Sequence, residues 1–130
     1  MATYAYTILY VPDVPSAIFF YERAFGFQHM FITEEKDYGE LLTGATTIAF
    51  VSQELAGRNL PKGFELSTPG GKPFGIELGI TTDDVQALVD QAVAEGAELY
   101  APPVEKPWGQ TVAYVRDLNG FLIEICTSIE

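Results

Sequence analysis

The sequence has few of the residues that bind nucleic acids or transition metals. Its 130 residues include one cysteine, one histidine and one tryptophan, and 7 basic residues stand against 18 acidic ones, giving a net charge of −11. A single cysteine, Cys126, excludes an internal disulfide, and we expect it to behave as a small core side chain. Nucleic-acid binding needs clustered lysines and arginines, so we expect no nucleic-acid partner. The acidity indicates a solvated surface, or a groove that attracts a cationic ligand.

Long apolar runs are also missing. No stretch approaches the roughly 18 apolar residues of a membrane span, so we expect no membrane partner. The N-terminus has no basic segment before an apolar one, which is atypical of a signal peptide. We therefore predict a cytoplasmic protein with a single domain over residues 1–130.

The first half of the chain has the pattern of a strand, a helix and three further strands. Asp13 is the predicted N-cap of the helix, Pro15 lies in its first turn and Gly26 follows its end. Strands are predicted over 4–11, 27–33, 38–42 and 46–52, and the helix over 15–25. We call this half, at about residues 1–53, the first module.

Residues 53–73 are rich in glycine and proline and are predicted to be a connecting loop, with a short helical turn near 54–57. A strand over 74–81 follows. Asp83 and Gln86 fit a capping box that opens a helix, and Gly96 closes it. An extended segment near 99–101, a break at Pro102-Pro103 and two final strands complete a second module at about 74–130, leaving a linker at about 54–73.

The two halves resemble each other. The stretch from Asp13 to Gly26 and the stretch from Asp83 to Gly96 are separated by a constant 70 residues, and alanines recur at the same offset. A repeat of this kind favours an α+β fold of two βαβββ modules, because neither module alone covers its own sheet. Coincidence between two amphipathic helices is the alternative.

The C-terminal hairpin carries an unusual acidic residue. Glu124 lies between Ile123 and Ile125, and side chains alternate along a strand, so Glu124 faces away from the isoleucines. A carboxylate at such a position needs a partner, water or a ligand.

Two motifs resemble those of the vicinal oxygen chelate superfamily, which includes glyoxalase I, bleomycin resistance proteins and extradiol dioxygenases. The first runs from Tyr10-Val11-Pro12-Asp13-Val14 through Phe20-Tyr21-Glu22 to Gly26-Phe27, and the second from Arg116-Asp117-Leu118-Asn119-Gly120 to Glu124. The resemblance implies two βαβββ modules forming a cupped, mostly antiparallel sheet with flanking helices, commonly paired as a homodimer. Because this fold hosts many activities, it does not by itself imply one.

Enzymes of that superfamily hold one divalent ion with four strand residues. By resemblance these positions fall on Tyr6, Ala49, Glu77 (or Ile76, one residue earlier) and Glu124. Alanine has no ligating atom, and a tyrosine phenol titrates near ~10. We therefore expect no full metal site and no cofactor, with Glu77 and Glu124 left as candidates for weakly held Mg²⁺ or Mn²⁺. The lone His29 lies away from these positions and is interpreted as a surface residue.

The resemblance also suggests ligand-binding residues. A tryptophan on a Pro/Gly-flanked loop, as in Pro107-Trp108-Gly109, resembles the loop that helps to form the crevice of bleomycin resistance proteins, and it offers a flat face to a cationic ligand. The predicted ligand-binding residues are Tyr6, Phe50, Trp108, Gln110 and Tyr114. For each aromatic residue other than Trp108, a role in the core is the competing interpretation.

Three hypotheses follow. The first is a metal-free binding protein for a small, cationic or aromatic molecule. The second is a lyase or isomerase that uses Glu124 or Glu77 as a general base or as the ligand of a weakly held ion. The third is a homodimer whose ligand site is vestigial.

Overall fold

The computed structural model describes residues 1–129 and confirms the α+β class. The chain forms two compact units, Met1–Leu66 and Ser67 onward, and each is described by itself. Their boundary falls inside the segment that was predicted to be the linker. Among the described residues, no helix is long and apolar enough to span a membrane.

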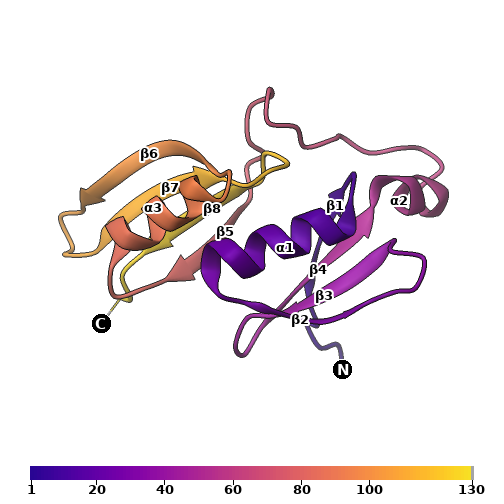
Figure 1. Ribbon diagram of the computed structural model, residues 1–130, viewed down its shortest axis with the longest axis horizontal. Helices are drawn as coiled ribbons and strands as arrows, with labels where there is room; N and C mark the ends of the chain where they lie inside the picture. The colour runs from indigo at the N-terminus through magenta and orange to yellow at the C-terminus, as the bar shows by residue number, and fades with distance from the viewer. Residues whose placement is uncertain (130) are drawn as a thin grey trace. The chain divides into compact units, whose positions relative to one another are not determined.

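The first unit is a four-stranded sheet with one long helix on one face (Figure 1). Its elements are β1 (Thr7–Val11), α1 (Val14–Phe25), β2 (Gln28–Ile32), β3 (Tyr38–Leu42), β4 (Thr47–Ser52) and α2 (Gln53–Asn59). The strand order is β1-β4-β3-β2, with β1 and β4 parallel and the other two pairs antiparallel.

Helix α1 is defined by residues that end a helix at both termini and by an apolar face that packs on the sheet. Asp13 is the N-cap residue, as predicted, although its side chain accepts a hydrogen bond from the Ser16 hydroxyl (2.7 Å) and not from a helix N–H. Gly26 ends the helix with φ 76°, a left-handed conformation that favours glycine. The fully buried Tyr21 packs on Phe50 of β4, with ring centroids 5.4 Å apart. Burial of each such aromatic side chain contributes roughly 1.5–3 kcal/mol.

The predicted helical turn after the last strand is a two-turn helix. Helix α2 spans Gln53–Asn59, and the Ser52 hydroxyl caps it by accepting the Leu55 N–H at 3.1 Å. The chain beyond α2 is tied to the first unit at Phe64, whose ring meets that of Tyr10 edge to face at 4.8 Å.

The second unit repeats the same plan. Its elements are β5 (Glu77–Thr81), α3 (Val85–Ala94), β6 (Glu98–Glu105), β7 (Thr111–Arg116) and β8 (Leu122–Cys126). The strand order is β5-β8-β7-β6, with β5 and β8 parallel. The described strands form two four-stranded sheets, one in each unit, and most of their pairings are antiparallel, as predicted.

Two local predictions in the second unit were wrong. The N-cap of α3 is Asp84, whose carboxylate accepts the Ala87 N–H at 3.0 Å, so the capping box on Asp83 does not form. Pro102 and Pro103 do not end the strand, because both lie inside β6, but the pairing of β6 with β7 shifts register between Ala101 and Val104. An edge strand tolerates proline, since one side of the strand needs no N–H donor, and β6 is at the edge of its sheet.

The segment that leads into β5 is fastened by Arg116. This buried side chain donates to the backbone carbonyls of Gly120 (3.0 Å), Thr68 (3.1 Å), Pro69 (3.3 Å) and Gly71 (2.6 Å). A β-carbon at Gly120 would collide with the Thr68 carbonyl, and the φ of 86° also favours glycine there. Arg116 therefore fixes residues 68–71 against the turn between β7 and β8.

The two units share the same strand topology, but the number of residues that separates matching positions differs slightly from the constant 70 expected. The N-caps Asp13 and Asp84 are 71 residues apart, whereas the closing glycines Gly26 and Gly96 are 70 apart, because α3 is shorter than α1. The strands of both halves therefore correspond at an offset of 71 before the helix. This offset pairs Tyr6 with Glu77.

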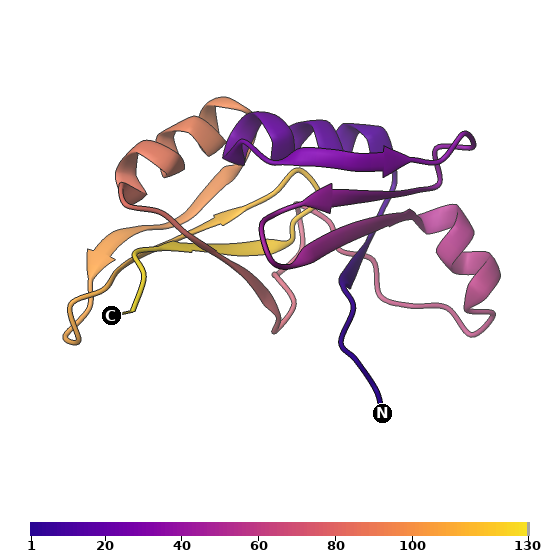
Figure 2. The same ribbon diagram turned by 90° about the horizontal axis from the view of Figure 1, so that it is seen from below.

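In each unit the long helix covers one face of the sheet (Figure 2). The opposite face of the second unit is covered by no helix among its described residues, whereas in the first unit the short helix α2 contacts β1 and β4. We call the face opposite the long helix the open face of the unit. Side chains alternate between the two faces, so the strand pairings decide which residues reach the open face.

Candidate functional site

The open face of the second unit carries two glutamates. Glu124 of β8 pairs with Gly79 of β5, and both Ile123 and Ile125 are fully buried on the helix side. Glu77 lies two residues before Gly79 and so shares the face of Glu124. Gly79 has no side chain to separate them. Ile76, the alternative candidate one residue earlier, lies before the start of β5 and is 71% exposed.

The two carboxyl groups interact directly. Partial loss of hydration, the negative charge of Glu124 and a hydrogen bond between the carboxyls raise the pKa of Glu77 above its ordinary value of 4.5. The negative charge of Glu124 therefore opposes ionisation of Glu77. We call Glu77 and Glu124 the carboxyl pair.

Two further side chains on the same face contact Glu124. The hydroxyl of Tyr114 donates to Glu124 Oε1 at 3.1 Å, and Tyr114 lies directly across from it on β7. Burial and this carboxylate raise the pKa of Tyr114. The Cys126 thiol also contacts Glu124, and burial together with that carboxylate raises its pKa to about 11. The thiol is therefore a neutral group at pH 7 and a poor nucleophile.

Gln110 extends the cluster toward Trp108. The Gln110 amide donates to the Thr127 carbonyl at 2.7 Å and accepts the indole N–H of Trp108 at 2.8 Å. It also contacts the Cys126 thiol. Five residues named from the sequence are thus gathered in the second unit: Glu77, Glu124, Tyr114, Gln110 and Trp108.

Trp108 lies at the tip of the hairpin between β6 and β7. The Gly109 N–H donates to the Lys106 carbonyl (2.8 Å) and the Lys106 N–H to the Gln110 carbonyl (2.7 Å). Gly109 has φ 97°, which closes the turn. The Trp108 side chain is left 66% exposed, which is unusual for the largest apolar residue.

The first unit has a different set at the matching positions. Tyr6 takes the place of Glu77, and Ala49 takes the place of Glu124 on the central strand β4. Glu40 of β3, the cross-strand partner of Ala49, matches Tyr114. The Tyr38 hydroxyl donates to Glu40 Oε2 at 2.6 Å, and burial and that carboxylate raise the pKa of Tyr38.

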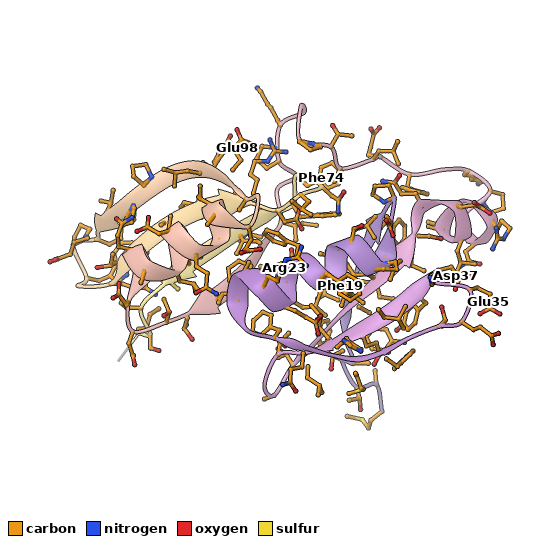
Figure 3. The ribbon with its side chains drawn as sticks, viewed as in Figure 1. Phe19, Arg23, Glu35, Asp37, Phe74 and Glu98 are labelled. Atoms are coloured by element: carbon orange, nitrogen blue, oxygen red, sulfur yellow. The ribbon has the colours of Figure 1, made fainter. Side chains whose placement is uncertain are left out.

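One aromatic residue expected near a ligand lies in the core. Phe50 shares the helix face with Leu9 and is fully buried under α1, so its ring is a core residue and we leave it out of the ligand-contacting set. Phe74, labelled in Figure 3, packs edge to face on Phe121 with ring centroids 6.2 Å apart. Tyr6, by contrast, is 43% exposed, as a residue on an open face can be.

The residues at the four metal positions do not fit the superfamily's metal site. Ala49 offers only a methyl group, and no group of three His, Cys, Asp or Glu side chains within residues 1–129 is placed to hold an ion. His29 is engaged elsewhere, with its Nδ1 2.9 Å from Glu22 Oε2 on the first unit. The carboxyl pair alone lacks the imidazole nitrogen that transition metals prefer.

Three participants were not singled out from the sequence as site residues. Gly79 of β5 pairs with Glu124, and Cys126 lies two residues after Glu124 on β8, on the same face. Glu40 of β3 lies directly across from Ala49. Alternation along β8 places Cys126 with Glu124 and is readable from the sequence. The pairing between strands far apart in the chain is not, because it depends on register.

A family model described as "Glyoxalase/Bleomycin resistance protein/Dioxygenase superfamily" matches residues 3–125. The chain is 30% identical over 122 residues to virulence protein STM3117 of Salmonella typhimurium, which covers 91% of this chain and 78% of that protein. The crystal structure of the same virulence protein aligns with a TM-score of 0.67 at 26% identity, covering 99% of this chain and 98% of that one.

Two further solved structures resemble the chain. A glyoxalase/bleomycin resistance protein/dioxygenase family enzyme from Burkholderia phytofirmans PsJN has a TM-score of 0.79 and 26% identity, covering 96% of this chain and 98% of that one. A lactoylglutathione lyase from Agrobacterium tumefaciens has a TM-score of 0.70 and covers 98% of this chain and 95% of that one. Its 18% identity shows a shared fold alone.

Proposed function

The chain belongs to the Glyoxalase/Bleomycin resistance protein/Dioxygenase superfamily, and we propose that it binds a small molecule on the open face of its second unit. In this proposal the carboxyl pair, Glu77 and Glu124, is the polar anchor, and Trp108 provides an apolar surface. The observation that carries the proposal is that Glu77 and Glu124 share one face of the paired strands β5 and β8, where they interact, and that no helix among the described residues of the second unit covers this face.

A close pair of carboxyls is costly for the fold. Like charges on one sheet face repel, and the negative charge of Glu124 raises the pKa of Glu77 above its ordinary value. The core does not need either group, since the helix side of β8 is filled by Ile123 and Ile125. Strain or repulsion retained on an open surface is typical of functional sites.

The pair favours ligands with a positive charge or several hydrogen-bond donors. Such a group offsets the repulsion between the carboxyls, so ligand binding and ionisation of Glu77 are linked. The net charge of −11 attracts a cation to the surface as well. The proposal requires no divalent metal ion, because the anchor is the carboxyl pair itself.

The proposal is tested with three probes: tetramethylammonium, benzyltrimethylammonium and benzyl alcohol. Binding is followed by the emission of Trp108, the one tryptophan of the chain. We expect benzyltrimethylammonium to quench the emission equally with and without EDTA, and Glu124→Gln to weaken its binding at least tenfold. Glu105→Gln, the same change at an exposed site on β6, should leave binding unchanged. Binding that needs an added metal ion, or that survives Glu124→Gln, contradicts the proposal.

An enzyme of the lyase or isomerase type is the second candidate. It is favoured by the raised pKa of Glu77 beside Glu124, because an acid and a carboxylate in contact suit the removal and return of a proton next to a carbonyl. Lactoylglutathione, named in the Agrobacterium neighbour, is a reasonable first compound to try.

For this candidate we would incubate the protein with lactoylglutathione in deuterated water and follow the C–H signal beside the carbonyl by NMR. Exchange that disappears in Glu124→Gln, while that variant keeps its fold, supports catalysis. Exchange at the rate of the protein-free solution argues against it for this compound.

The expectation of a cytoplasmic homodimer stays a prediction. Sedimentation at several protein concentrations distinguishes a 14.3 kDa monomer from a dimer.

A further inference from the structure

Gln110 was expected to contact a ligand, but both ends of its amide are already used within the protein. Its Oε1 accepts the Trp108 indole N–H at 2.8 Å, and its Nε2 donates to the Thr127 carbonyl at 2.7 Å. An indole N–H can only donate and a carbonyl can only accept, so these two partners force one orientation of the amide. A ligand would have to break one of these bonds to use Gln110.

The backbone around Gln110 is held as firmly as its side chain. The Thr111 N–H donates to the Thr127 hydroxyl (3.0 Å), and the Thr127 N–H donates to the Thr111 carbonyl (3.0 Å). The Lys106 N–H meets the Gln110 carbonyl on the other side at 2.7 Å. Both the backbone and the side chain of Gln110 are therefore held in place between the end of β8 and the turn that carries Trp108.

An exposed tryptophan at a hairpin tip would otherwise rotate freely about its two side-chain torsions. A hydrogen bond from the edge of the indole to a fixed acceptor removes much of that freedom and leaves both ring faces uncovered by the bond. The entropy of ordering the ring is then lost on folding and not on binding, which strengthens binding to a flat partner.

Resting on the proposed function of the carboxyl pair, we propose that Gln110 is a positioning residue that holds Trp108 as a preformed stacking wall for the planar part of the ligand. Gln110 also contacts the Cys126 thiol, which contacts Glu124, so a continuous chain of side chains connects the wall to the anchor. The ligand class is therefore an aromatic or conjugated group joined to a cationic or donor group by a short link.

The first test uses Gln110→Met, which keeps the length of the side chain and removes both hydrogen bonds. The readout is the time-resolved fluorescence anisotropy of Trp108 without any ligand. We expect the amplitude of the fast, sub-nanosecond decay to rise at least twofold. The matched control is Gln86→Met on α3 of the same unit, which removes one side-chain hydrogen bond to Asp90 (2.9 Å) far along the chain from the hairpin. Its fast amplitude should equal that of the wild type.

The second test compares probes. Gln110→Met should weaken benzyltrimethylammonium about tenfold while changing tetramethylammonium, which has no ring, less than twofold. A merely structural role would lower thermal stability without this difference between probes. Unchanged Trp108 mobility in Gln110→Met, or equal effects on both probes, overturns the proposal.

The outcomes separate this inference from the proposed function. A wild-type protein that binds neither cationic probe contradicts the proposed function and, with it, the stacking role. A wild-type protein that binds both cationic probes with the same affinity supports the carboxyl anchor and overturns the stacking wall alone.

Discussion

The open faces of the two units are built on equivalent strands in the same order, yet they carry different polar side chains. In the first unit, Ala49 lies on the central strand β4, directly across from Glu40 of β3. The carboxylate of Glu40 accepts a hydrogen bond from the Tyr38 hydroxyl at 2.6 Å. In the second unit, the matching central position is Glu124, and a second glutamate reaches it.

The difference comes from very few positions. Exchange of Tyr6 for Glu77 and of Ala49 for Glu124 between matching sites turns a face with one hydrogen-bonded carboxylate into a face with two carboxyls in contact. The backbone scaffold is the same in both units. The repeat therefore supplies the framework, and side chains at matching positions decide which unit carries the site.

The largest test of this comparison is to copy the second unit's glutamate into the first. Ala49→Glu places a carboxylate at a fully buried position, directly across from Glu40. We expect a loss of about 2–4 kcal/mol in the free energy of unfolding at pH 7, because the new group is desolvated and faces a like charge. Thermal denaturation should show a Tm lowered by roughly 8–15 °C.

The matched control is Ala49→Gln, which has the same size and no charge. It shares the cost of overpacking, so the gap between the two variants measures the charge alone. The gap should close near pH 4, where the new carboxyl is protonated. Equal stability of the two variants at pH 7 would mean that the first unit accepts a carboxyl pair as readily as the second.

An intermediate effect is expected when the tyrosine donors of the two faces are removed one at a time. Tyr38→Phe deletes the short hydrogen bond to Glu40 and should cost about 1 kcal/mol in chemical denaturation. Tyr114→Phe deletes a longer bond of 3.1 Å to Glu124 and should cost less. The reverse order would show that the second face depends on its tyrosine more than its geometry indicates.

The smallest effect is a gain in stability. The pKa of Glu77 is raised in the folded protein, so folding favours its protonated form, and the contribution of this group is lost as the pH rises through the folded pKa. Glu77→Gln imitates the protonated acid and should raise Tm by roughly 1–3 °C at pH 7, since the site is exposed and screened. The gain should shrink as the pH falls toward 4.5. A variant less stable than the wild type at pH 7 would indicate that the pair stabilises the fold.

Much of this arrangement is predictable from the sequence. The helix ends at Asp13 and Gly26, the repeat, and the position of Glu124 on the face away from Ile123 and Ile125 follow from capping, spacing and alternation, which are local. The candidate residues Glu77 and Trp108 came from motif resemblance.

What the sequence could not supply depends on contacts between distant strands. Phe50 looked like a cavity residue until the pairing with Leu9 placed it under α1. Gln110 looked like a free polar group, and only the approach of Thr127 shows that its amide is occupied. The proline pair in β6 was misread because its position at the sheet edge is a property of the whole sheet.

The central claim is that the carboxylate of Glu124 lies close enough to Glu77 to raise its pKa. Carbon-13 NMR of the glutamate side-chain carboxyls, followed from pH 3 to pH 8, measures it directly. The account predicts that Glu77 titrates above the ordinary value of 4.5, and that Glu124→Gln returns its pKa closer to that value. Titration of Glu77 near ~4.3, unaffected by the substitution, would contradict it.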